Sequence, residues 1–132
     1  MSKIAIIIPS YEPDERLVHL IDDLVNSNIG PIYIVNDGSS ESFDSIFEEI
    51  TGAIHNSGGT ILKHDVNKGK GRALKTAFEY ILQNTNDVQA VVTADSDGQH
   101  TCKCIKKVIE ASQSNHQSLI LGVRTFDQED IP

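Results

Sequence analysis

Short apolar runs alternate with amphipathic segments along the chain. The runs are rich in β-branched residues and bounded by turn-forming residues, which indicates β-strands; they cover 4–8, 32–35, 60–62, 90–94 and 119–123. Between them, apolar residues recur at the three- and four-residue spacing of a helix, over 17–25, 43–50, 74–82 and 105–109. This alternation predicts βαβ units and an α/β fold, in which a mostly parallel sheet carries helices on both faces.

Polar segments follow the predicted strands. The strands themselves are apolar almost throughout, as expected for a sheet covered on both faces, and ligands of such sheets bind beyond the carboxyl ends of the strands. The segments at those ends are Pro9 to Glu12, Asn36 to Ser40, His64 to Gly69, Asp95 to His100, and Arg124. We therefore expect the functional site at this edge of the sheet.

Composition narrows the class of protein. The chain has 132 residues, of which 39% are hydrophobic, so we expect a single globular domain over residues 1–132. The net charge of −8 argues against nucleic acid or an anionic membrane as a general partner, because both select basic surfaces. No apolar run approaches the roughly 20 residues of a spanning helix, and no signal peptide opens the sequence. These features predict a cytoplasmic location.

Two aspartates separated by one residue follow the fourth apolar run. Asp95 and Asp97 lie in a turn that Gly98 permits, and two carboxylates so placed can hold one divalent cation that bridges the oxygens of a diphosphate. Gln99 can add a neutral oxygen. The alternative is an Asx turn that caps the next helix, but the position directly after a buried strand favours the metal.

Three bases and two glycines surround the start of the third helical segment. The bases are Lys68, Lys70 and Arg72, and the N–H groups at a helix start favour a phosphate. The spacing fits neither a dinucleotide-binding motif nor a P-loop. A solvated basic helix start is the alternative, but such clustering in an acidic chain favours local neutralisation of an anion.

Asp37 and Asp65 lie near the ends of the second and third strands. A carboxylate there can accept hydrogen bonds from a nucleotide base or ribose, and we expect this of Asp37 because its charge would repel a diphosphate. The alternative for this segment is a turn whose serines, Ser39 and Ser40, cap the following helix.

Four of these segments resemble, in order and approximate spacing, the motifs of family 2 inverting glycosyltransferases, which have the GT-A fold of nucleotide-diphospho-sugar transferases. They are Ile8 to Glu12, Val35 to Ser40, Asn67 to Gly71 and Ala94 to His100. The branch that looks closest contains dolichyl-phosphate mannose synthase and bacterial polyprenyl-phosphate glycosyltransferases. The resemblance extends over nearly all of the chain.

The resemblance implies transfer of a sugar, with inversion, from a nucleoside-diphosphate sugar to an acceptor such as a polyprenyl phosphate or a glycan. It implies Mg²⁺ or Mn²⁺ bound by Asp95, Asp97 and Gln99, and identifies no catalytic base. It also implies a nucleotide-sugar pocket formed by Pro9, Tyr11, Glu12, Asp37, Asp65, Lys68 and Arg124.

The family continues past the position of Pro132 with acceptor-binding elements and, in some members, membrane helices. We therefore expect a donor-binding domain truncated at its C-terminal end and inactive alone. The full-length protein would act at the inner face of the membrane, and membrane contact would come only through the missing parts or the acceptor.

Three other functions are compatible with parts of the sequence. In a haloacid-dehalogenase-like phosphatase Asp95 would be the nucleophile, but that family opens its fold with this motif. A sugar nucleotidyltransferase would carry its glycine-rich basic loop after the first strand, where this chain has Pro9 to Tyr11. A non-catalytic nucleotide-binding module would bind the nucleotide without transferring a sugar.

Overall fold

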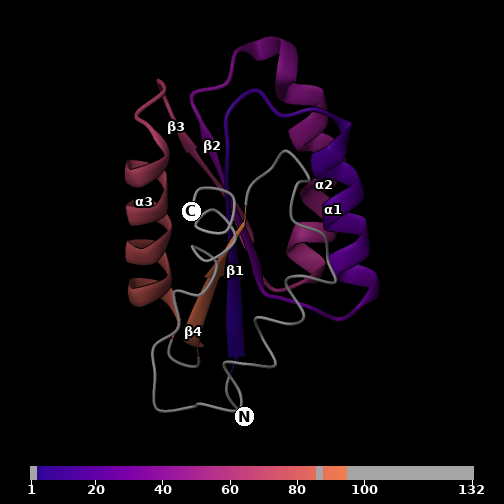
Figure 1. Ribbon diagram of the computed structural model, residues 1–132, viewed down its shortest axis with the longest axis vertical. Helices are drawn as coiled ribbons and strands as arrows, with labels where there is room; N and C mark the ends of the chain where they lie inside the picture. The colour runs from indigo at the N-terminus through magenta and orange to yellow at the C-terminus, as the bar shows by residue number, and fades with distance from the viewer. Residues whose placement is uncertain (1–2, 86–87, 95–132) are drawn as a thin grey trace, which may run out of the picture.

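A four-stranded parallel sheet, in the order β3-β2-β1-β4, forms the centre of the protein (Figure 1). The structure is a computed structural model and describes residues 3–85 and 88–94. Its strands are β1 (Lys3–Ser10), β2 (Ile32–Asp37), β3 (Thr60–His64) and β4 (Val88–Thr93). Its helices are α1 (Glu15–Asn26), α2 (Asp44–Asn56), α3 (Lys70–Asn84) and a short 3₁₀ helix, η1 (Glu41–Phe43).

Helices cover both faces of the sheet, which confirms the predicted fold class. Helices α1 and α2 lie on one face and α3 on the other (Figure 1). The strand predicted over 119–123 and the helix predicted over 105–109 lie outside the described residues.

The two covered faces of the sheet explain why the strands are apolar almost throughout. In β1, Ile6 and Ile8 pack with α1 and α2, whereas Ala5 and Ile7 pack with α3. All four side chains are fully buried. Because successive residues of a strand point to opposite faces, a strand covered on both sides needs apolar residues at every position.

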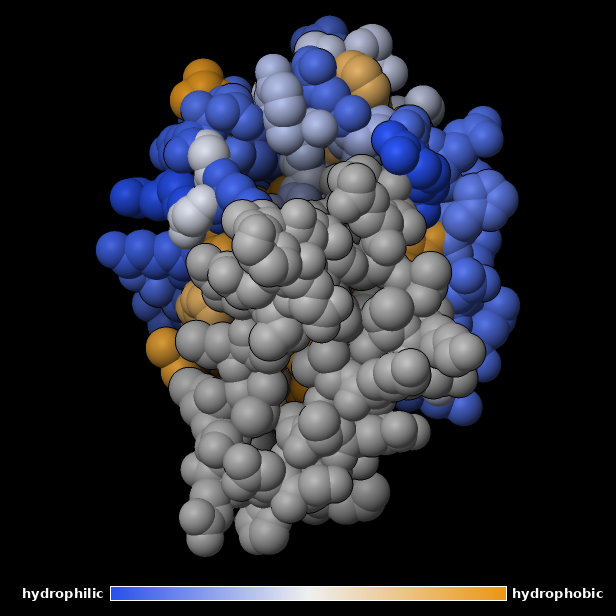
Figure 2. Space-filling view, in the orientation of Figure 1, coloured by the Kyte–Doolittle hydropathy of each residue, from blue (hydrophilic) through white to orange (hydrophobic). Residues whose placement is uncertain are grey.

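The helices present one apolar face each. Helix α3 meets the sheet through Ala73, Ala77 and Ile81, and the two alanines are fully buried. Helix α1 begins after Asp14, whose carboxylate accepts the Arg16 N–H at 2.9 Å and so caps the helix. The outward faces are polar, and Figure 2 shows mostly hydrophilic residues along both sides of the molecule. Among the described helices, none is both long enough and apolar enough to cross a membrane.

The order of the strands reverses between β1 and β4. From β1 the chain proceeds outward through β2 to β3, and then returns through α3 to pair β4 with the other side of β1. The pairing extends to Ala94, whose N–H donates to Ile7 O at 3.0 Å. Such a reversal opens a crevice at the carboxyl ends of the strands, where open α/β sheets bind ligands.

Candidate functional site

Six of the predicted site residues lie in the described part of the chain, at or just beyond the carboxyl ends of β1, β2 and β3. Pro9 is half-buried within β1 and Asp37 is buried at the last position of β2. The other four are exposed: Tyr11, Glu12, Asp65 and Lys68. The remaining predicted residues lie outside the described part of the chain; they are Asp95, Asp97, Gln99 and Arg124.

One hydrogen bond joins the loop after β1 to the loop after β2. The backbone N–H of Glu12 donates to Ser39 Oγ at 2.7 Å, while Ser39 N–H donates to Asn36 Oδ1 at 3.1 Å. Glu12 has a positive φ of 49°, a strained conformation for a residue with a side chain. This bond therefore helps to hold the β1 loop in a shape that the backbone alone disfavours.

The alternative for this segment, in which Ser39 and Ser40 cap the following helix, is wrong. Ser40 occupies the N-cap position of η1 but makes no side-chain cap bond there, and its hydroxyl instead lies 2.9 Å from the Ser42 hydroxyl. Ser39 uses its hydroxyl for the link to Glu12. The physical reason is that the neighbouring β1 loop offers a backbone N–H within reach, which a local sequence pattern does not reveal.

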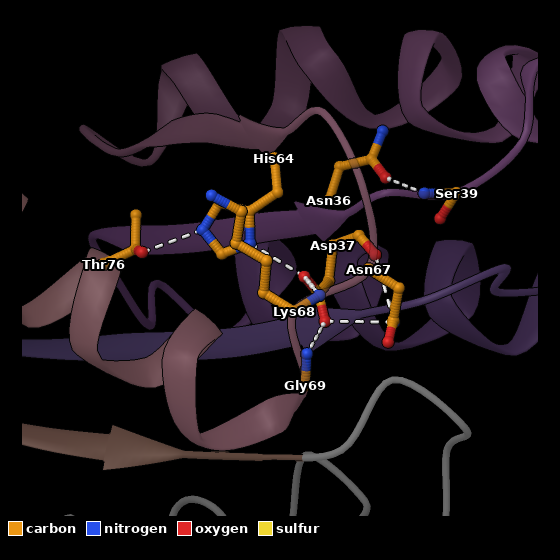
Figure 3. Close-up of polar contacts among 8 residues, drawn as sticks. All are labelled: Asn36, Asp37, Ser39, His64, Asn67, Lys68, Gly69 and Thr76. Carbon is orange, nitrogen blue, oxygen red and sulfur yellow. Dashed lines mark hydrogen bonds and ion pairs between the residues drawn. The ribbon is translucent and has the colours of Figure 1, made fainter.

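The carboxylate of Asp37 fastens the loop after β3 to the end of β2 (Figure 3). Its Oδ1 accepts from Lys68 N–H at 2.9 Å and lies 2.7 Å from His64 Nδ1. Its Oδ2 accepts from Gly69 N–H at 3.0 Å and from Asn67 Nδ2 at 3.1 Å. A carboxylate has about four acceptor positions, so partners within the chain use the full capacity of Asp37.

These contacts keep Asp37 ionised. Burial acts to raise the pKa of this carboxyl, but the hydrogen bonds from His64 and from the Lys68 and Gly69 N–H groups outweigh it and hold the pKa below its ordinary value. A ligand that bonded directly to Asp37 would have to share or displace one of its four partners. The contact with a base or ribose expected from the sequence stays a prediction.

The same contacts change what the start of α3 offers to an anion. We expected N–H groups at this helix start to bind a phosphate, but the N–H groups of Lys68 and Gly69 point to Asp37. Asp37 thus supplies the negative charge that a helix N-terminus favours. The exposed Lys68 side chain still projects from a loop whose backbone is fixed.

Gly38 allows the two loops to meet. It has a φ of +75°, and a Cβ at this position would lie 2.1 Å from Asn67 N and 2.2 Å from the carbonyl carbon of Val66. Both atoms belong to the backbone, so the β3 loop crosses Gly38 at a distance that only glycine permits.

Sequence reasoning did not identify the roles of His64 and Thr76. His64 ends β3 beside Asp37, its register partner on β2, and its Nε2 lies 2.8 Å from Thr76 Oγ1 on α3. The sequence feature that could have indicated this contact is that β3 ends in a histidine and the adjacent strand β2 ends in an aspartate. Using it requires the strand order and register, which the sequence pattern does not specify.

The predicted metal ligands Asp95, Asp97 and Gln99 lie outside the described residues. Within residues 3–85 and 88–94, no group of three or more His, Cys, Asp or Glu side chains could hold a metal ion. Asp95 and Asp97 follow Ala94, the last residue described at the end of β4. The metal assignment stays a prediction.

Comparisons with known proteins bear on the whole chain. Residues 5–132 match glycosyl transferase family 2. A UDP-N-acetylglucosamine–dolichyl-phosphate N-acetylglucosaminyltransferase of Methanococcus voltae is 30% identical over 131 residues, covering 92% of this chain and 51% of that protein. An uncharacterized protein of Methanocaldococcus jannaschii is 23% identical over 129 residues, covering 98% of this chain and 49% of that protein. The chain thus spans about half the length of these relatives, and no solved structure matches it.

Proposed function

The chain belongs to glycosyl transferase family 2, and we propose that it binds a nucleoside-diphosphate sugar and transfers the sugar, with inversion, to a polyprenyl phosphate. The family match favours this function over the phosphatase that the D-x-D-G sequence also permits. The name of the Methanococcus voltae relative supports both the class of donor and the class of acceptor.

One observation carries the proposal for the donor site. The loops after β1, β2 and β3 are fastened to each other, through Glu12 and Ser39 on one side and through Asp37 and the β3 loop on the other. These three connected loops lie at the carboxyl ends of their strands, next to the point between β1 and β4 where the strand order reverses. A fixed, polar strand-end edge at such a reversal is where a nucleotide binds in α/β sheets.

The exposed groups along this edge match the parts of a nucleotide diphosphate. Tyr11, which is 52% exposed, offers a ring against which a base can stack. Glu12 and Asp65 are carboxylates that can accept hydrogen bonds from ribose hydroxyls. Lys68, with Arg124 from the part of the chain beyond the described residues, supplies positive charge for the diphosphate.

We assign the divalent cation, Mg²⁺ or Mn²⁺, to Asp95 and Asp97, with Gln99 as a third oxygen ligand. Two carboxylates and an amide oxygen suit a hard cation of this kind. When bound, it would neutralise charge on the departing diphosphate. Support comes from the sequence, in which both aspartates follow β4, the strand that pairs with β1 across the reversal of strand order.

A polyprenyl phosphate acceptor would bring the reaction to a membrane surface. Its phosphate is already anionic, so attack on the sugar would need no protein base to remove a proton. The absence of an identified catalytic base is compatible with such an acceptor. The cytoplasmic location inferred from the sequence stays a prediction.

Titration calorimetry with a panel of nucleoside diphosphates, with and without Mn²⁺, tests the proposal. We expect metal-dependent binding by the wild-type chain and its loss in Asp95→Ala and Asp97→Ala, with unfolding curves unchanged. Release of nucleoside diphosphate from a donor sugar, and its dependence on an added polyprenyl phosphate, then tests transfer. Metal-dependent binding without any transfer by the full-length protein would support a nucleotide-binding module, and absence of binding to every nucleoside diphosphate would refute the proposed function.

A further inference from the structure

We propose that His64, oriented by Thr76, is a positioning residue for the donor site: it sets the Asp37 carboxylate that holds the loop of Val66 to Gly69. This inference rests on the proposed function. It concerns two side chains, His64 at the end of β3 and Thr76 on α3: His64 contacts Asp37, and Thr76 contacts His64 (Figure 3).

The geometry defines the hydrogen-bonding state of His64. Its side chain is 8% exposed, and each ring nitrogen has a polar partner, Asp37 Oδ1 at 2.7 Å and Thr76 Oγ1 at 2.8 Å. An ionised carboxylate can only accept, so Nδ1 must carry a proton. In the neutral ring Nε2 is then an acceptor, and the Thr76 hydroxyl donates to it. Asp37 therefore selects the tautomer in which His64 donates to it, and the Thr76 hydroxyl holds the other end of the ring.

The contact between His64 and Asp37 affects the loop of Val66 to Gly69, because both His64 and the loop backbone bond to the Asp37 carboxylate. Oδ1 receives both His64 and the N–H of Lys68, so a rotation of the carboxylate away from His64 would also disturb the bond to the loop backbone. Asp37 belongs to β2, His64 to β3 and Thr76 to α3. The three side chains thus connect the sheet to the helix that begins where the loop ends, and they fix the position from which Lys68 projects.

Amide variants of His64 separate the two contacts. In His64→Asn the side-chain NH₂ can occupy the place of Nδ1 and donate to Asp37, but it cannot reach Thr76. In His64→Gln the longer side chain reaches the place of Nε2 and loses the bond to Asp37. We expect His64→Gln to weaken nucleoside-diphosphate binding in Mn²⁺ by about tenfold, and His64→Asn to weaken it less, since a hydrogen bond to a charged group is the stronger of the two.

Threonine variants test orientation without removing the ring. Thr76→Val deletes the hydroxyl at nearly constant volume and should weaken binding by about threefold, whereas Thr76→Ser should bind like the wild type. Thr51→Val is the matched control: Thr51 is also half-buried on a helix, and its hydroxyl donates to Phe47 O at 2.8 Å on α2, away from the proposed site. It should leave binding unchanged even where it lowers the urea midpoint.

Two measurements test the inference without requiring nucleotide binding. Nitrogen-15 spectra of the His64 ring should show the tautomer protonated at Nδ1, and hydrogen exchange at the amides of Lys68 and Gly69 should be faster in Thr76→Val than in Thr51→Val. If the wild-type chain binds no nucleoside diphosphate, the proposed function fails, and these two results alone decide the inference.

The inference is overturned by a ring protonated only at Nε2, or by equal amide exchange in the two valine variants. It is also overturned if the wild type binds nucleoside diphosphate and both variants, His64→Gln and Thr76→Val, bind it with the same affinity as the wild type.

Discussion

Replacing Gly38 with alanine should lower both the stability of the protein and nucleotide binding at the proposed donor site. The new Cβ would lie 2.1 Å from Asn67 N and 2.2 Å from Val66 C, and the φ of +75° disfavours any residue with a side chain. The positive φ costs about 1–2 kcal/mol, and forcing an extra carbon against a packed backbone costs about 1–3 kcal/mol. We expect Gly38→Ala to lower the free energy of unfolding by about 2–5 kcal/mol.

Two other glycines provide matched controls. A Cβ on Gly59 would lie 1.7 Å from Ile32 O, at the start of β3 and far from the loop edge, whereas a Cβ on Gly52 within α2 would meet nothing within 4 Å. Gly59→Ala should therefore destabilise by about 1–3 kcal/mol through the clash alone. Gly52→Ala should stabilise by about 0.5–1 kcal/mol, because alanine is the better helix former.

Urea unfolding followed by circular dichroism gives the free energies by linear extrapolation, and calorimetry with nucleoside diphosphate and Mn²⁺ gives the affinities. The decisive comparison uses conditions in which all variants are folded. There Gly38→Ala should bind more weakly than Gly59→Ala, because only the former moves the loop that carries Lys68. If Gly38→Ala is as stable as the wild type, or binds as well as Gly59→Ala, the close approach of the two loops is not as described.

Three further changes probe other contacts. Asp37→Asn should cost about 1.5–3 kcal/mol near neutral pH, because it removes the charge from a buried carboxylate that accepts four hydrogen bonds. Since the folded pKa of Asp37 lies below the ordinary 3.8, its contribution in the wild type is complete above that pH and is lost as the pH falls through the folded value. Urea midpoints measured from pH 7 to pH 2 should therefore converge for the two proteins, and parallel curves would contradict this. Glu12→Gly should be more stable than Glu12→Ala by about 1 kcal/mol in urea, because glycine relieves the positive φ, and equal midpoints would count against strain there. Ser57→Ala should cost about 1–2 kcal/mol in urea, because Ser57 Oγ accepts from buried Ile32 N–H at 3.0 Å, and an unchanged midpoint would show that this bond contributes little.

Local pattern was sufficient to predict the described elements but not their arrangement. Each predicted strand from 4–8 to 90–94 overlaps an observed strand, and the periodic apolar residues over 17–25 and 74–82 lie within α1 and α3. These predictions succeeded because burial on both faces of a sheet, or on one face of a helix, leaves a signature within a few residues. The family was also recognisable, because four ordered motifs carry far more information than any single motif.

The hydrogen bonds of Asp37 could not be predicted from the local sequence pattern. Its partners lie about 30 positions away, at His64 and in the loop that ends at Gly69. They become neighbours only through the parallel register of β2 and β3, in which Asp37 pairs with His64. The sequence identified Asp37 as a candidate site residue, whereas the structure shows that groups of the chain itself use the acceptor positions of its carboxylate.

The position of β4 bears on the order in which the protein assembles. Strands β1, β2 and β3 follow one another along the chain and pair with their successors, but β4 pairs Val92 with Ile6, at the opposite end of the described sequence. Closing so long a loop costs more entropy than forming the neighbouring pairs. We therefore expect a nascent chain to pair its first three strands while the outer edge of β1 is still unpaired. During that time a strand of another chain could pair with that edge. Among the described strands, the last to be made is therefore the one that covers the open edge of β1.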